Sequence, residues 1–125
     1  MEKKKILIVD DEVELVEMLA MRLRASGYEV FSVADGEDAL ATVRADKPDL
    51  ILLDIMLPKI DGYKICSAIK KDAEFKETPV ILLTAKDAMH EADKLEAAGA
   101  DHCIIKPFEP KELLDKIKEL IKRTA

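Results

Sequence analysis

The sequence predicts a single α/β domain in which five parallel strands form one doubly wound sheet with five helices on its two faces. Two observations support this fold class. Short apolar runs, typical of strands buried on both faces, alternate five times with longer segments of helical periodicity. The 125 residues suit one domain with one core, and right-handed crossovers place helices on both sides of such a sheet. The strands expected on this basis cover residues 6–9, 28–33, 50–54, 79–84 and 103–105.

Capping and breaking residues bound the helices. The helices are expected from residue 13 to Gly27, from Asp35 to Pro48, from Asp61 to Lys71, from Asp87 to Gly99, and from Pro110 onward. We interpret Asp35, Asp38 and Asp61 as caps. In the first helix the apolar positions at helical spacing are Val13, Val16, Leu19, Ala20 and Leu23. The fourth helix has a thin apolar face, and residues 122–125 are expected to form at most the start of a linker.

Composition excludes several classes of function. The formal net charge of −6 argues against a nucleic-acid-binding surface. The two cysteines, Cys66 and Cys103, have neither metal-ligand spacing nor a redox motif, as in reduced cytoplasmic proteins. No apolar run has the length of a membrane span, and residues 6–9 are too short for the core of a signal peptide. We therefore expect a cytoplasmic domain that binds neither membranes nor nucleic acid directly.

Polar residues end the apolar strands, and they predict where the chemistry lies. Asp10 and Asp11 follow the first strand, Asp54 ends the third, Thr84 ends the fourth and Lys106 follows the fifth. Parallel strands end at one edge of a sheet, where open α/β sheets hold their sites. If the first and third strands are neighbours, three carboxylates meet there. A helix cap explains a single acid such as Asp11 equally well, but it does not explain the whole set.

The remaining polar candidates carry less weight. His90 and His102 have no partner pattern that would predict a ligand role for either histidine.

Four motifs make the chain similar to the receiver domain of bacterial response regulators. They are Ile-Leu-Ile-Val-Asp-Asp-Glu (6–12), Asp-Leu-Ile-Leu-Leu-Asp-Ile-Met-Leu-Pro-Lys-Ile-Asp-Gly (49–62), Pro-Val-Ile-Leu-Leu-Thr-Ala (79–85) and Gly-Ala-Asp-His-Cys-Ile-Ile-Lys-Pro-Phe (99–108). The resemblance covers essentially the whole chain and implies a receiver domain over residues 1–125. It also implies the flavodoxin-like, CheY-like strand order 2-1-3-4-5. Periodicity alone does not give that order.

The resemblance implies a phosphoryl-accepting aspartate and a magnesium ion. Asp54 is the residue that accepts the phosphoryl group, as carboxylates do in covalent catalysis. Crowded acids raise one another's pKa unless a cation lies among them, and Mg²⁺ suits oxygen ligands and phosphoryl groups. By resemblance Asp11 and Asp54 bind Mg²⁺ directly, Asp10 acts partly through water, and the carbonyl of Met56 completes the protein ligands.

Further roles follow from the same resemblance. Lys106 supplies a point charge for a phosphoryl oxygen, and the Thr84 hydroxyl donates a hydrogen bond to another. The peptide bond between Lys106 and Pro107 is expected to be cis. Thr84 and the residue at 103 form the switch in this family, but the usual aromatic residue is replaced here by Cys103. We therefore expect Thr84 and the fourth helix to carry most of the rearrangement.

Two positions are expected to set the lifetime of the aspartyl phosphate. In receivers the residues two after the aspartate and two after the threonine flank the path of the attacking water. Here they are Met56 and Lys86. Methionine cannot position a water, and a lysine can pair with phosphoryl oxygens, so both should slow hydrolysis. The alternative is that Met56 only packs against its loop.

The resemblance also implies the partners. A sensor histidine kinase or a phosphotransfer protein donates the phosphoryl group, and the receiver catalyses this transfer to itself without being a turnover enzyme. The output is a separate target or a further domain of a longer chain. Residues 54–58 resemble receivers of winged-helix transcription factors, which dimerise through the fourth helix, fifth strand and fifth helix. His102 replaces an acid often found on that face, which weakens the expectation of such a dimer.

Three rival classes of protein fit the pattern less well. A phosphatase of the haloacid dehalogenase type needs a second acid two residues after the nucleophile, where this chain has Met56. An inactive receiver-like binding module would lack one of Asp54, Thr84 or Lys106, and all three are present. A flavin-binding protein of this fold would carry a hydroxyl- and glycine-rich loop after the first strand, and the sequence has none there.

Overall fold

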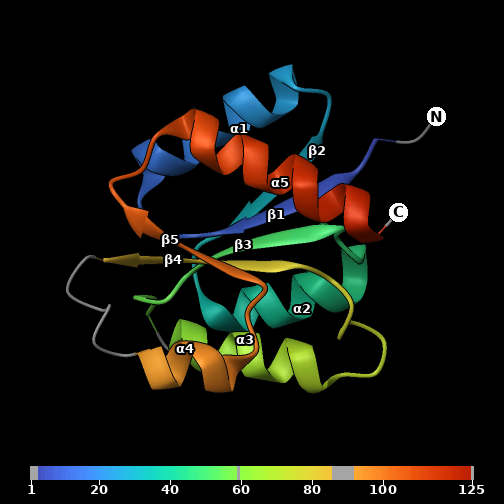
Figure 1. Cartoon of the computed structure of the whole chain (residues 1–125), viewed down its shortest axis with the longest axis vertical. Coiled ribbons are helices and arrows are strands. Elements are labelled where there is room, and N and C mark those ends of the chain that lie inside the picture. The colour runs from blue at the N-terminus through green and yellow to red at the C-terminus, as the bar shows by residue number, and fades with distance from the viewer. Residues whose placement is uncertain (1–2, 59, 86–91, 125) are drawn as a thin grey trace.

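The computed structural model contains one parallel sheet of five strands in the order β2-β1-β3-β4-β5 (Figure 1). It describes residues 3–58, 60–85 and 92–124. The strands are β1 (Lys5–Val9), β2 (Glu29–Val33), β3 (Leu50–Asp54), β4 (Val80–Ala85) and β5 (His102–Lys106). The helices are α1 (Val13–Ala25), α2 (Gly36–Asp46), α3 (Gly62–Lys71), α4 (Ala92–Ala98) and α5 (Pro110–Thr124). The fold class and strand order expected from the sequence are confirmed.

Two apolar cores lie on the two faces of the sheet. Helices α1 and α5 cover one face, and α2, α3 and α4 cover the other (Figure 1). In β1 the side chains alternate between them: Ile6 and Ile8 belong to the core under α1 and α5, whereas Leu7 and Val9 belong to the opposite core. Every residue of β3 is buried, which explains why its sequence is a continuous apolar run that ends in one acid.

The register of β1 against β3 sets the position of the acids. Ile6 pairs with Leu50 and Val9 with Leu53, so the residues that come next, Asp10 and Asp54, lie side by side at the carboxyl edge. Strand β4 pairs with β3 on one side and with β5 on the other. The polar residues that end or follow β1, β3, β4 and β5 therefore gather at one edge of the sheet.

Gly62 allows α3 to begin directly against the end of β3. A Cβ atom at this position would lie 2.5 Å from the Cα of Ile55 and 2.6 Å from the carbonyl oxygen of Asp54. Both contacts are to backbone, which cannot move aside. Asp61 caps the helix by accepting a hydrogen bond from the backbone N–H of Lys64. This part of the motif at residues 49–62 thus serves to hold the loop after Asp54 close to the sheet.

Several expected boundaries and caps need correction. Asp35 caps α2, but Asp38 is no cap, because it lies in the first turn and its backbone N–H donates to Asp35. Helix α5 continues to Thr124, so residues 122–124 are helical instead of the start of a linker. Residues 87–91 of the expected fourth helix lie outside the described residues. The positive φ angles of Gly27 and Gly99, 96° and 77°, confirm both helix ends.

The inward face of α1 is shorter than its apolar pattern predicts. Leu19, Ala20 and Leu23 are buried as expected, and Val16 is half-buried, but Val13 is 68% exposed. Val13 is the first residue of the helix and precedes the turns that cover the sheet, so its periodic position does not bury it. Within the described residues, no helix combines the length and apolarity that crossing a bilayer requires.

Candidate functional site

Three carboxylates surround the ammonium group of Lys106 at the carboxyl edge of the sheet. Lys106 ends β5 and reaches toward β1 and β3. Its Nζ lies 2.8 Å from Oδ2 of Asp10, 3.1 Å from Oε1 of Glu12 and 3.3 Å from Oδ2 of Asp54. The side chains of Asp10 and Asp54 are buried, with 0% and 6% exposed, whereas that of Glu12 is 60% exposed. The site is thus a buried aspartate pair, closed by one lysine, with a third acid at its opening.

Each buried aspartate is held in the same way. Oδ1 of Asp10 accepts a hydrogen bond from the backbone N–H of Glu12 at 2.9 Å, and Oδ1 of Asp54 accepts one from Met56 at 2.9 Å. The other oxygen of each aspartate, Oδ2, faces Lys106. The loop after each strand therefore orients one oxygen, and the lysine orients the second.

The Asp54 carboxylate and the Lys106 ammonium influence each other's pKa. Burial raises the pKa of Asp54, and the charge of Asp10 adds to this, while the Met56 N–H and Lys106 act in the opposite direction. Burial lowers the pKa of Lys106, but its hydrogen bonds to Asp10 and Glu12 and the charge of Asp54 outweigh this effect. The pKa of Lys106 lies above its ordinary value, so the ammonium stays charged throughout the physiological range.

Thr84 and Cys103 meet at the other end of the same edge. Thr84 is fully buried, and the Cys103 thiol donates a weak hydrogen bond to its Oγ1, with 3.6 Å between sulfur and oxygen. Cys103 pairs with Leu82 in the sheet, and Thr84 lies two residues further along β4, on the same face. Cys103, at the position where the sequence resemblance leads one to expect an aromatic residue, is therefore in contact with the Thr84 hydroxyl.

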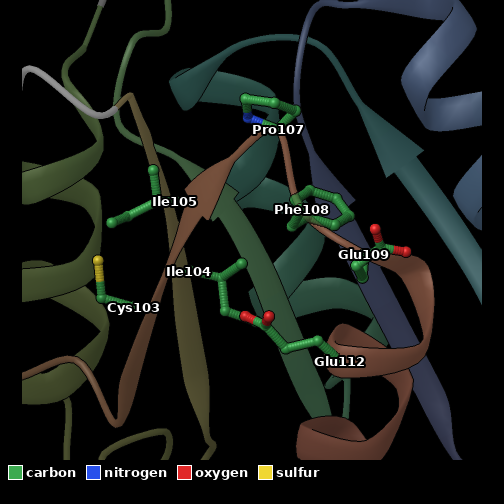
Figure 2. A pocket seen from close by; sticks show the side chains of 7 residues that line it. All are labelled: Cys103, Ile104, Ile105, Pro107, Phe108, Glu109 and Glu112. Carbon is green, nitrogen blue, oxygen red and sulfur yellow. The ribbon is translucent and has the colours of Figure 1, made fainter.

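A hollow of about 470 Å³ lies beside Cys103, between β5 and the start of α5 (Figure 2). Its lining residues are Cys103, Ile104, Ile105, Pro107, Phe108, Glu109 and Glu112. Figure 2 shows Cys103 and Ile105 on one side of β5 and Ile104 on the other. The peptide bond between Lys106 and Pro107 is cis, as the sequence resemblance implies. The same short segment thus joins the lysine of the acidic site to the hollow.

Some residues singled out in the sequence do not contribute a side chain to the acidic site. Asp11 is exposed and, together with Asp10, lines a separate depression next to α1, so the third carboxylate beside Lys106 belongs to Glu12. Met56 is 72% exposed, and Lys86 lies outside the described residues. His102 is half-buried, and burial followed by the charge of Lys116 lowers its pKa.

Cys66 is a buried residue of the core between the sheet and helices α2, α3 and α4. Cys66 is fully buried, its Sγ lies 3.4 Å from the carbonyl oxygen of Ala98, and burial raises the pKa of the thiol to about 11. His90 lies outside the described residues, so its expected lack of a ligand role is untested.

Sequence reasoning missed Glu12 as a site residue. Its only signal is its place directly after the two aspartates, and a glutamate there is equally suited to the first turn of a helix. Glu12 is in fact the N-cap residue of α1, yet its side chain makes no cap hydrogen bond and pairs with Lys106 instead.

The donor set fits a hard divalent cation. Among the described residues, Asp10, Glu12 and Asp54 each offer a carboxylate oxygen, and these oxygens lie within 4.8 Å of one another. Magnesium prefers such oxygen ligands and pairs with one or two carboxylates while it retains water.

The fold and the site together define a class of protein. Its members have a doubly wound sheet with buried aspartates, a lysine and a threonine at the carboxyl edge. A family model described as "Response regulator receiver domain" matches residues 6–118, and the chain belongs to this family. Proteins of this family are signalling proteins of two-component systems, and receiver domains bind Mg²⁺ in their acidic site and interact with histidine kinases and output domains.

Individual relatives agree with this assignment. The chain is 45% identical over 124 residues to the probable transcriptional regulator ycf27 of Cyanophora paradoxa. The matched region covers 98% of this chain and 50% of that protein. The chain spans about half the length of the curated relatives it matches.

Solved structures show the same fold. A putative response regulator from Chloroflexus aurantiacus is 37% identical, with a TM-score of 0.91 and coverage of 97% of this chain and 99% of that one. The receiver domain of the sensor histidine kinase PA1611 from Pseudomonas aeruginosa, described with a magnesium ion coordinated in its active-site cleft, is 30% identical, with a TM-score of 0.88 and coverage of 97% and 99%. The family resemblance inferred from the sequence is confirmed. Neither a phosphatase of the haloacid dehalogenase type nor an inactive receiver-like module is favoured.

Proposed function

We propose that residues 1–125 form one receiver domain in which Asp54 accepts the phosphoryl group. One observation carries this proposal: the Asp54 carboxylate lies buried at the end of the central strand, with one oxygen bonded to the Met56 N–H and the other facing Lys106. A carboxylate held in this way is oriented for attack and lies next to a charge that can stabilise a phosphoryl group.

In the proposed reaction an oxygen of Asp54 attacks the phosphorus atom of a phosphohistidine. A phosphorus–oxygen bond forms as the phosphorus–nitrogen bond breaks, and the imidazole leaves with the electron pair and takes up a proton. Lys106 binds a phosphoryl oxygen through its charge, and the Thr84 hydroxyl turns from Cys103 to donate to another. The receiver modifies itself in this step and does not turn over a separate substrate.

Magnesium would supply the positive charge that brings the phosphoryl group and the acids together. Asp11, Asp54 and the carbonyl of Met56 are the proposed direct ligands, and Asp10 is proposed to act partly through water. The cluster of carboxylate oxygens within 4.8 Å supports a cation at this edge. Because Asp11 is exposed, its role as a ligand requires that it turn toward the site.

The proposed partners follow from the family. A sensor histidine kinase or a phosphotransfer protein donates the phosphoryl group in the cytoplasm, and the change at Thr84 and α4 is passed to a target or to an output domain. The regulator ycf27 suggests transcription as the output of a longer protein, since this chain spans 50% of it. A phosphorylation-dependent dimer through α4, β5 and α5 is a further proposal.

Acetyl phosphate tests the central assignment without a kinase. The chain is incubated with this donor in Mg²⁺ and in EDTA, and its intact mass is measured. We expect one phosphoryl group on the parent in Mg²⁺, none in EDTA and none on Asp54→Ala. Asp61→Ala, which removes an aspartate from the same loop, is the matched control and should label like the parent. Labelling of Asp54→Ala at the parental level, or full labelling in EDTA, would contradict the assignment.

A further inference from the structure

The geometry points to Glu12 as a positioning residue that holds Lys106 in the unphosphorylated protein and competes with the phosphoryl group for its charge. This inference rests on the proposed phosphorylation of Asp54. The lysine ammonium has three N–H donors and no acceptor. In the structure Asp10, Glu12 and Asp54 accept from it at 2.8, 3.1 and 3.3 Å. The three carboxylates therefore account for all of its donors, and a phosphoryl oxygen gains one only when a carboxylate gives one up.

The three partners of Lys106 differ in how readily they can release it. Asp10 has no exposed side-chain surface and is fixed through its second oxygen by a backbone N–H, so leaving it unpaired would be costly. Asp54 is itself the group that reacts. Glu12 is 60% exposed, and water can solvate its carboxylate after release. Of the two partners of Lys106 that do not themselves react, Glu12 is therefore the one that can release the ammonium group at low cost.

The local conformation of Glu12 supports this role. It occupies the N-cap position of α1, where an acidic side chain could accept backbone N–H bonds, yet it makes no cap hydrogen bond and reaches Lys106. Its own backbone N–H donates to Oδ1 of Asp10. One residue thus orients a buried aspartate through its backbone and the lysine through its side chain.

The inferred effect has a definite sign. A phosphoryl group on Asp54 brings negative oxygens toward an ammonium that Glu12 already engages, and the Glu12 carboxylate also repels those oxygens. Replacing Glu12 by the neutral and nearly isosteric glutamine should therefore favour the phosphorylated state. Because Glu12 is largely exposed, we expect a modest gain of about two- to fivefold, which corresponds to about 0.4–1 kcal/mol at 1.4 kcal/mol per tenfold.

Affinity for beryllofluoride, a phosphoryl mimic, measures this competition at equilibrium. The 125-residue chain is titrated in saturating Mg²⁺, and binding is followed by NMR. Glu12→Gln should bind about two- to fivefold more tightly than the parent. Glu14→Gln, which removes the same charge from an exposed position in the first turn of α1, is the matched control and should bind like the parent.

A double-mutant cycle tests whether Glu12 acts through Lys106. In a Lys106→Met background the gain from Glu12→Gln should largely disappear, although that background binds beryllofluoride weakly. Equal affinities of Glu12→Gln and Glu14→Gln, weaker binding by Glu12→Gln, or a gain that persists undiminished without the lysine would each overturn the inference. A parent chain that takes up no phosphoryl group or beryllofluoride at Asp54 would overturn the proposed function and, with it, this inference.

Discussion

The two ends of the carboxyl edge differ in how firmly their polar groups are held. At the end formed by β1 and β3, both oxygens of Asp10 and of Asp54 have partners within 3.3 Å, and Lys106 joins the two carboxylates. At the end formed by β4 and β5, the Thr84 hydroxyl meets a thiol at 3.6 Å. The polar groups of the first end are held by several short contacts, whereas the Thr84 hydroxyl at the second end has a single weak one.

This difference has a physical cause in the residue types. Charge-assisted hydrogen bonds to buried carboxylates are roughly twice as strong as neutral ones, and a thiol is among the weakest donors. Cys103 is also much smaller than an aromatic residue, and a hollow of about 470 Å³ lies beside it (Figure 2). The proposed reaction needs fixed groups, while the proposed switch needs a group that can move, and this contrast between the two ends agrees with both proposals.

The largest effect is expected from removing Lys106, which links Asp10 and Asp54 at the end formed by β1 and β3. Lys106→Met leaves Asp10 and Asp54 buried without their cation, and breaking a buried ion pair by removing one partner costs about 3–5 kcal/mol. Urea unfolding in EDTA should show a loss of about 3 kcal/mol, and Mg²⁺ should restore part of it. Lys111→Met removes a lysine from an exposed pair with Asp115 and should have little effect on the free energy of unfolding. Equal losses in the two variants would remove the distinction between the two ends.

A smaller effect is expected at the opening of the site, on the lifetime of the aspartyl phosphate. Met56→Asn replaces an exposed thioether by an amide that can position water two residues after Asp54. We expect hydrolysis to be about tenfold faster, which requires only about 1.4 kcal/mol in the barrier. Loss of the phosphoryl group is followed by intact mass, with Met21→Asn, a similarly exposed methionine on α1, as the control. If phosphorylated Met56→Asn loses its phosphoryl group at the parental rate, Met56 does no more than pack against its loop.

The smallest effect is a pH dependence at Asp54. The folded protein raises the pKa of Asp54, so between the unfolded pKa and the higher folded pKa the folded state binds more protons. The free energy of unfolding therefore falls as the pH rises through this window. Asp54→Asn, which stays neutral, should be more stable than the parent at pH 7 in EDTA, and the gain should vanish as the pH falls below the unfolded pKa. Urea unfolding of the two proteins across this pH range measures the difference, and a gain that stays the same at low pH would contradict the prediction.

Much of the architecture follows from the sequence alone. The apolar run at 50–53 ends in Asp54, and parallel strands share a carboxyl edge, so the location of Asp10, Asp54 and Lys106 along one edge of the sheet was predictable. The strand order was not, because periodicity fixes neither which strands are neighbours nor which lie at the edges. It came from the family resemblance.

Side-chain directions after the strand ends were beyond the sequence. Successive residues of an extended chain point to opposite sides, which sends Asp10 into the site and leaves Asp11 exposed. The reach of Glu12 to Lys106 depends on rotamers of an exposed side chain, which no pattern encodes. The contact between Cys103 and Thr84 depends on the register of β4 against β5, and no sequence feature specified it.

Backbone NMR with beryllofluoride tests the contrast between the two ends most directly. In saturating Mg²⁺, amide shifts are compared with and without beryllofluoride, in the parent and in Asp54→Ala. We predict large changes next to Asp54, at Thr84 and Ala85 and in α4, smaller ones at Cys103, and none in Asp54→Ala. Large changes at Cys103 with almost none at Thr84 and α4 would contradict the account.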